Sequence, residues 1–136
     1  MTVSQALEKL SAYEKLMFTY NHASGLMYYD GATVAPKGSA DLRADTLGEL
    51  ARLSYALTTA PETVEMLRTL VEARDRLDPV TARKVSELWR DYEMTHRVPE
   101  EEFVAYQQLT SKADAVWHEA KERSDFALFE PYLQQV

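Results

Sequence analysis

His118 has the neighbours that come nearest to a known catalytic spacing. Two histidines one helical turn apart, with a glutamate directly after the first, can bind one zinc ion while the carboxylate activates its water. His118 and Glu119 begin this pattern, but the position four residues after His118 is Glu122. A histidine and a glutamate at that spacing could share a metal ion. We favour the alternative, in which His118 is an exposed helical residue beside a carboxylate one turn away.

The other candidate reactive groups stand alone in the sequence. His22 lies toward the end of the first predicted helix and His96 at the end of the fourth, where a protonated imidazole suits the negative end of the helix dipole. Thr33 has no base beside it and is better explained by a local backbone hydrogen bond than as a nucleophile. We therefore predict that this chain contributes no catalytic residue, no metal ligand and no cofactor-binding residue.

Asp30 is the carboxylate for which a special role can be argued, because it precedes Gly31 at a predicted chain reversal. One interpretation makes it a contact in a substrate groove or with a catalytic domain. The other makes it a turn residue that bonds its own backbone or pairs with Arg43, and we favour this structural interpretation.

Composition excludes several classes of function. The chain has 136 residues, a net charge of −7 and no cysteine. An acidic chain repels phosphate backbones, so we expect no nucleic-acid partner. No apolar run approaches the roughly 20 residues that cross a bilayer, and the N-terminus is not typical of a signal peptide. We expect a soluble, cytoplasmic protein with one domain over residues 1–136, without disulfides or membrane contact.

Apolar residues recur every three to four positions along most of the chain, which predicts an all-α bundle of about five or six helices with short connections. The first helix is expected over about residues 3–28, followed by a loop from Tyr29 to Lys37. The predicted helix starts are the capping boxes Thr2–Gln5 and Thr59–Glu62, the caps Ser39 and Asp78, the acidic turn Glu100–Glu102 and the cap Ser124-Asp125.

The segment between the first two helices resembles a known family. Tyr29-Asp30, Thr33, Pro36, Gly38 and Arg43 are similar to the aromatic-Asp-x-x-Thr-x-x-Pro-x-Gly…Arg segment near the start of the thermostable (Taq-type) zinc metallocarboxypeptidases. Later segments resemble the N-terminal helices of that family in the same order. They are Arg90-Asp91-Tyr92, Val98-Pro99-Glu100-Glu101, Ala115-Val116-Trp117, Glu119-Ala120-Lys121 and the stretch from Ser124 to Leu133.

The resemblance implies a helical protein related to zinc enzymes that remove C-terminal residues from peptides and are usually dimeric. The family's His-Glu-x-x-His zinc motif and its later catalytic segments do not occur in this sequence. We therefore expect an N-terminal, non-catalytic helical domain that forms part of the wall and cover of the active-site groove and is inactive alone. Zinc is implied only for full-length relatives. The alternative is a freestanding helical interaction or dimerisation module derived from the family.

The segment from Phe126 to Leu133 is the most apolar in the chain and predicts an interface. Most of the aromatic residues have helical spacing and are expected in the core. Those of this last segment need another partner, which we expect to be a missing catalytic domain or a second copy of the chain. The candidate interface or groove contacts are Tyr29, Asp30, Arg43, Phe126, Phe129 and Tyr132.

Overall fold

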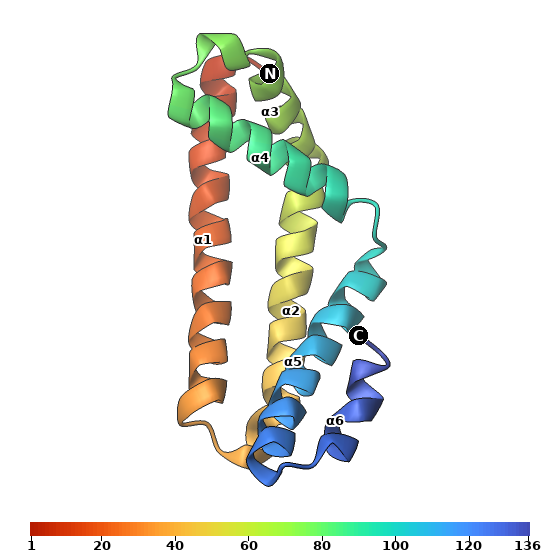
Figure 1. Cartoon of the computed structure of the whole chain (residues 1–136). Coiled ribbons are helices and arrows are strands. Elements are labelled where there is room, and N and C mark those ends of the chain that lie inside the picture. The colour runs from red at the N-terminus through yellow and green to blue at the C-terminus, as the bar shows by residue number, and fades with distance from the viewer. The chain divides into compact units, whose positions relative to one another are not determined.

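The computed structural model describes the backbone of residues 1–136 and every side chain except that of Lys37. Helices make up the described chain, which contains no strand, so the all-α bundle predicted from the sequence is confirmed (Figure 1). The helices are α1 (Val3–Thr33), α2 (Ala40–Thr59), α3 (Pro61–Glu72), α4 (Pro79–Thr95), α5 (Glu100–Arg123) and α6 (Phe126–Leu133), with short 3₁₀ turns η1 (Lys37–Ser39) and η2 (Arg74–Arg76). None of the helices within the described residues combines the length and apolar character of a membrane span.

The helices form two compact units. The first unit contains Met1–Tyr20 and Leu53–Pro99, and the second contains Asn21–Arg52 and Glu100–Val136. Both α1 and α2 therefore contribute to each unit. The expectation of one domain over residues 1–136 stays a prediction.

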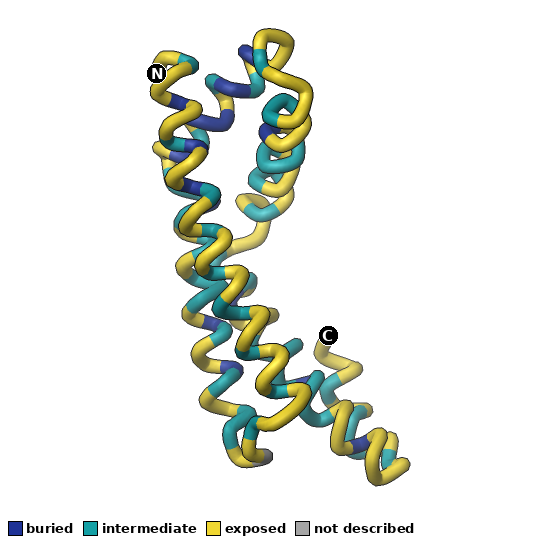
Figure 2. The backbone as a smooth tube through the Cα atoms, turned by 90° about the vertical axis from the view of Figure 1, so that its left-hand side faces the viewer, coloured by how far each residue is buried: buried dark blue, intermediate teal, exposed yellow. Residues whose placement is uncertain are grey.

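The core of the first unit is built from the N-terminal part of α1 together with α3 and α4 (Figure 2). Its buried side chains are Ala6, Leu10, Tyr13, Met66, Leu67, Leu70 and Val85. Burying a side chain the size of leucine or valine contributes about 1.5–3 kcal/mol, so this cluster is a main source of the unit's stability. On α1 the buried face is Ala6, Leu10 and Tyr13, whereas Leu7, which shares the predicted apolar spacing, is 38% exposed.

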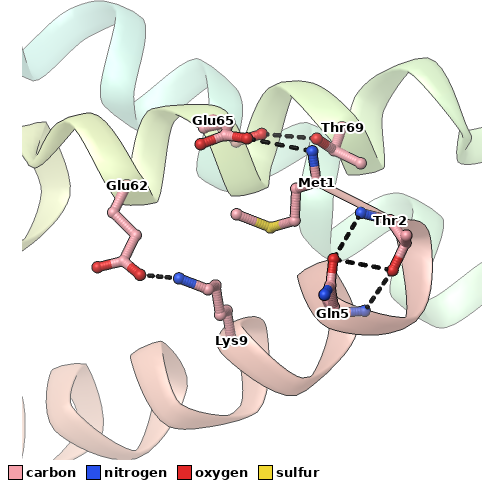
Figure 3. A network of polar contacts seen from close by, with 7 residues as sticks. All are labelled: Met1, Thr2, Gln5, Lys9, Glu62, Glu65 and Thr69. Carbon is pink, nitrogen blue, oxygen red and sulfur yellow. Dashed lines mark hydrogen bonds and ion pairs between the residues drawn. The ribbon is translucent and has the colours of Figure 1, made fainter.

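Polar contacts fix the start of α1 and join it to α3 (Figure 3). The predicted capping box is confirmed, because the Gln5 amide donates to Thr2 Oγ1 over 3.2 Å and the Thr2 amide donates to Gln5 Oε1 over 3.0 Å. Reciprocal bonds of this kind satisfy amides that the first helical turn leaves without partners. Two ion pairs reach α3, one between the Met1 ammonium and Glu65 at 3.2 Å and one between Lys9 and Glu62.

The start of α4 follows the sequence prediction. Asp78 Oδ1 accepts hydrogen bonds from the amides of Val80 and Thr81, each over 3.1 Å, and Pro79 occupies the first helical position. Hydrogen bonds from Thr81, through its side chain and then its backbone, lower the pKa of the Asp78 carboxyl. The carboxylate is the form that these donors stabilise.

Two other predicted caps are wrong. Thr59 is the last residue of α2, and its hydroxyl donates to the Tyr55 carbonyl over 2.8 Å, while Ala60 takes the cap position of α3 without a side-chain bond. The Ser39 hydroxyl donates to the Pro36 carbonyl over 2.7 Å within η1. Serine and threonine readily bond a carbonyl three or four residues earlier, and here this local bond replaces the cap.

Small residues of α2 and α5 are buried in the second unit. Ala44 is fully buried and Ala113 nearly so. A Cβ added at Gly48 would lie 2.6 Å from Nε2 of Gln108, so the glycine makes room for this side chain. Two ion pairs join the same helices, with 3.4 Å between Lys112 and Asp41 and 2.7 Å between Arg52 and Glu100.

The end of α5 is closed by Ser124, which has a φ of 51°. The Asp125 amide donates to the Ala120 carbonyl over 2.9 Å, and the Ser124 amide donates to the Lys121 carbonyl over 3.2 Å. This pair of bonds defines a Schellman motif, whose left-handed residue is usually glycine. Ser124 therefore ends α5, and the predicted cap Ser124-Asp125 for α6 is wrong, because Asp125 occupies the cap position of α6 without a side-chain hydrogen bond to the helix.

Replacing Ser124 with glycine is expected to raise the free energy of unfolding by about 1 kcal/mol, because a Cβ is disfavoured at positive φ. Ser86→Gly, in the interior of α4, is the matched control and is expected to lower it, since glycine weakens a regular helix. Urea unfolding followed by circular dichroism measures both changes. A Ser124→Gly protein no more stable than the parent would contradict this account of the turn.

Tyr13 is the buried titratable group of the first core. Its side chain is 6% exposed, and its hydroxyl lies 3.4 Å from Thr58 Oγ1. Burial raises the pKa of the Tyr13 phenol, the bond with Thr58 opposes that shift, and the charge of Asp91 adds to it. The buried site therefore favours the neutral phenol.

The raised pKa of Tyr13 predicts a loss of stability at alkaline pH. Above the unfolded pKa of about 10, the unfolded chain releases a proton that the folded chain retains, so the free energy of unfolding falls as pH rises through the folded pKa. Below pH 10 this contribution is fully present. Urea unfolding from pH 8 to 11 is expected to show a smaller decline for Tyr13→Phe than for the parent. Tyr106→Phe, which removes an exposed phenol, controls for tyrosine loss, and equal declines in the parent and Tyr13→Phe would contradict the assignment.

Candidate functional site

Helix α1 continues further than the sequence predicts, through Asp30 and Gly31 to Thr33. The Thr33 hydroxyl donates to the Tyr29 carbonyl over 2.6 Å, and the amides of Val34 and Ala35 both donate to the Asp30 carbonyl. One glycine costs a helix only about 1 kcal/mol, which hydrogen bonding and packing offset. The predicted loop from Tyr29 is therefore wrong at its start, and Asp30 is a helical residue instead of a turn residue.

Gly31 faces α2 and makes room for Arg43. A Cβ added at Gly31 would lie 2.6 Å from Nε and 2.8 Å from Cζ of Arg43. The guanidinium therefore lies directly against the α1 backbone. Its Nη1 donates to Ser39 Oγ over 3.1 Å. The bare backbone at Gly31 and the Ser39 hydroxyl together fix the position of the Arg43 cation.

An open pocket of about 410 Å³ lies between the last turns of α1 and the first turns of α2. Its lining residues are Leu26, Met27 and Asp30 from α1 and Ser39, Leu42, Arg43 and Thr46 from η1 and α2. The lining combines apolar side chains with one carboxylate and one guanidinium. We call it the α1–α2 pocket. Such a composition is typical of a small-molecule site, where a few polar groups orient a ligand against an apolar wall.

The structure brings together two of the six candidate contacts predicted from the sequence. Asp30 and Arg43 both line the α1–α2 pocket, whereas Tyr29 is 68% exposed and is not part of its lining. Leu26, Met27, Leu42 and other lining residues were not predicted as site residues. Helical spacing could have found some of them, because residues three or four apart share a helix face. Leu26 and Met27 lie four and three residues before Asp30, and Thr46 lies three residues after Arg43.

The three aromatic candidates lie on α6. Phe126 is 61% exposed, while Phe129 and Tyr132 are partly buried. The rings of Phe126 and Phe129 meet edge to face, with centroids 6.4 Å apart. None of the three lines the α1–α2 pocket. Their assignment as interface contacts stays a prediction.

The histidines do not assemble a zinc site within the described residues. No three side chains among the described histidines, aspartates and glutamates come together in a geometry that could hold a metal ion. His118 Nε2 lies 3.9 Å from Asp114 Oδ2, the carboxylate one turn earlier on α5. His96 stacks on Tyr92 with ring centroids 4.7 Å apart. The described donor set does not fit a zinc ion.

Comparison with known proteins identifies the class to which this helical chain belongs. The family described as carboxypeptidase Taq (M32) metallopeptidase matches residues 9–136. The chain therefore belongs to the carboxypeptidase Taq family of metallopeptidases, as the segment containing Asp30 and Arg43 predicted.

Individual relatives agree with this assignment. The chain is 36% identical to carboxypeptidase 1 of Bacillus subtilis over 135 residues and 30% identical to thermostable carboxypeptidase 1 of Thermus thermophilus over 138 residues. The alignments cover 94% and 100% of this chain. A crystal structure titled BsuCP matches 97% of the chain with a TM-score of 0.89 and 34% identity. The chain spans 27% of the length of both relatives and 26% of the BsuCP chain.

Proposed function

We propose that this chain is the N-terminal, non-catalytic helical part of a Taq-type zinc metallocarboxypeptidase, an enzyme that removes C-terminal residues from peptides. The observation that carries the proposal is the match to the BsuCP structure. The match covers 97% of this chain but only 26% of the BsuCP chain. Relatives named as carboxypeptidases contain the same segment as about a quarter of their length. The zinc ligands would belong to the remaining part of such an enzyme.

In this proposal the helices form part of the wall and cover of the active-site groove. Asp30 and Arg43 contribute charged groups to a pocket on that wall, and Tyr29 adds an exposed ring next to Asp30 in sequence. A wall of this kind would contribute to catalysis without breaking a bond itself, because binding and orienting a peptide is a large part of catalysis. We place the protein in the cytoplasm as part of the same proposal, because a chain without cysteine suits a reducing compartment.

The purified chain is expected to release no C-terminal residue from peptides, with or without added zinc. Incubation with unblocked peptides ending in apolar residues, followed by mass spectrometry, measures the trimming directly. Carboxypeptidase 1 of Bacillus subtilis assayed in parallel provides the positive control. Zinc-dependent trimming by the chain, abolished by a chelator, would overturn the non-catalytic assignment.

A second candidate is a freestanding helical module that associates through α6. The observation that favours it is the exposed apolar surface of that helix, where Phe126 is 61% and Leu133 53% exposed. Apolar surface of this kind is usually covered by a partner. In the first proposal the partner is the catalytic part of the enzyme. In the second it is another copy of the chain, joined as a symmetric homodimer.

The two candidates share a test on Phe126. We expect the chain to self-associate in sedimentation experiments or, as a monomer, to bind a hydrophobic dye. Phe126→Ser is expected to weaken whichever of these occurs, because it removes an exposed aromatic ring from α6. Val80→Ser, which removes a 71% exposed valine from α4, is the control and should leave it unchanged. A strict monomer that binds no dye would contradict an interface on α6.

A further inference from the structure

We propose that the α1–α2 pocket binds a free apolar α-amino acid. In this arrangement the ligand carboxylate lies on Arg43, its ammonium group lies on Asp30, and its side chain packs against Leu26 and Leu42. The pocket belongs entirely to the second unit and needs no residue from outside this chain. The inference therefore goes beyond the proposed peptidase role and does not depend on it.

Arg43 supplies the group for the carboxylate. A guanidinium carries five N–H donors in a planar fork and binds carboxylates through two parallel hydrogen bonds. Nη1 donates to Ser39 Oγ, and Nε and Cζ lie against the backbone at Gly31. These contacts hold the guanidinium in one place. They are made by a hydroxyl and by backbone, and not by a carboxylate. Because the cation is already positioned, little conformational entropy is lost when a ligand binds.

Asp30 supplies the opposite charge on the other wall. Its carboxylate accepts hydrogen bonds only, so it complements an ammonium group and disfavours a second anion. Arg43 lines the same pocket from α2. A phosphate or a fatty acid would satisfy Arg43 but place negative charge near Asp30. A zwitterion meets both groups, and this charge complementarity favours an amino acid over a simple anion.

The apolar lining determines which amino acids fit. Leu26 is 57% exposed and Leu42 is 72% exposed, so both have apolar surface that a ligand side chain can cover. Met27 adds an adaptable side chain to the same wall. The volume of about 410 Å³ falls within the usual range for small ligands, roughly 300–1,000 Å³. Leucine and similar residues are the expected ligands, and charged side chains are disfavoured.

The test is titration of the ¹⁵N-labelled chain with L-leucine, followed by two-dimensional NMR. Gly31 lies against the Arg43 guanidinium, so its amide signal should shift saturably, while the signal of Gly48, which lies against Gln108, should not. N-acetyl-L-leucine keeps only the carboxylate and L-leucinamide keeps only the ammonium group. Each is expected to bind about tenfold more weakly, because each loses one charge-assisted contact. L-glutamate should also bind more weakly than L-leucine.

Substitutions separate the three contacts. Arg43→Gln removes the partner of the ligand carboxylate, so it is expected to abolish the preference for leucine over leucinamide. Asp30→Asn removes the partner of the ammonium group, so it is expected to abolish the preference for leucine over N-acetyl-leucine. Leu42→Ser changes an exposed side chain, so the fold should persist while leucine binding weakens. Gly31→Ala should weaken binding by displacing the guanidinium. Arg83→Gln, at a largely exposed arginine on α4, is the matched control and should bind leucine as the parent does.

The outcomes are distinct from those of the peptidase proposal, because no bond is cleaved in this test. Saturable leucine binding that is weakened in Arg43→Gln and Leu42→Ser supports the site. No saturable shift at Gly31 overturns it. N-acetyl-leucine binding as tightly as leucine would overturn the assignment of a free amino acid, since the ammonium contact with Asp30 would then contribute nothing.

Discussion

The contact between the Arg43 guanidinium and the bare backbone at Gly31 is the interaction on which the α1–α2 pocket depends. Protein interiors are packed so closely that a single added carbon atom forces its neighbours to move. At this position the added carbon would meet the guanidinium itself. A similar arrangement occurs where Gly48 admits the side chain of Gln108. In the second unit, glycines thus determine where long polar side chains lie. This is a different use of glycine from the chain reversal that the sequence alone indicated at Gly31.

The helices were predictable where a local signal and tertiary packing agree. The capping box at Thr2 and Gln5 and the cap at Asp78 both make the bonds that their sequence patterns predict. The predictions failed where one side chain has two local choices. Thr59 bonds a carbonyl of α2 instead of starting α3, and this competition is decided by neighbouring structure. A periodic apolar pattern also cannot tell which face is buried. Leu42 fits the stripe of α2 but is 72% exposed, while Ala44 is fully buried.

The candidate site was predictable in part, for a related reason. Asp30 and Arg43 were identified through the resemblance of their segment to a family, and the structure places both in one pocket. The apolar lining was missed because the first helix was expected to end near residue 28. With α1 continuing to Thr33, Leu26, Met27 and Asp30 lie within little more than one turn on a single helix face. The position of a helix end therefore decided whether these residues could be recognised as one surface.

The α1–α2 pocket and the aromatic surface of α6 differ in the kind of partner that each could bind. The pocket walls are the end of α1 and the start of α2, joined by only six residues between Thr33 and Ala40. So short a connection restricts how far the walls separate, and the bond from Arg43 to Ser39 restrains one of them further. Pre-organisation of this kind lets a small ligand bind without ordering the protein. The aromatic residues of α6 instead present an exposed ring at Phe126, whose burial requires a second macromolecular surface. The two proposals, ligand recognition at the pocket and association through α6, therefore rest on different residues of the same helical unit and can be tested separately.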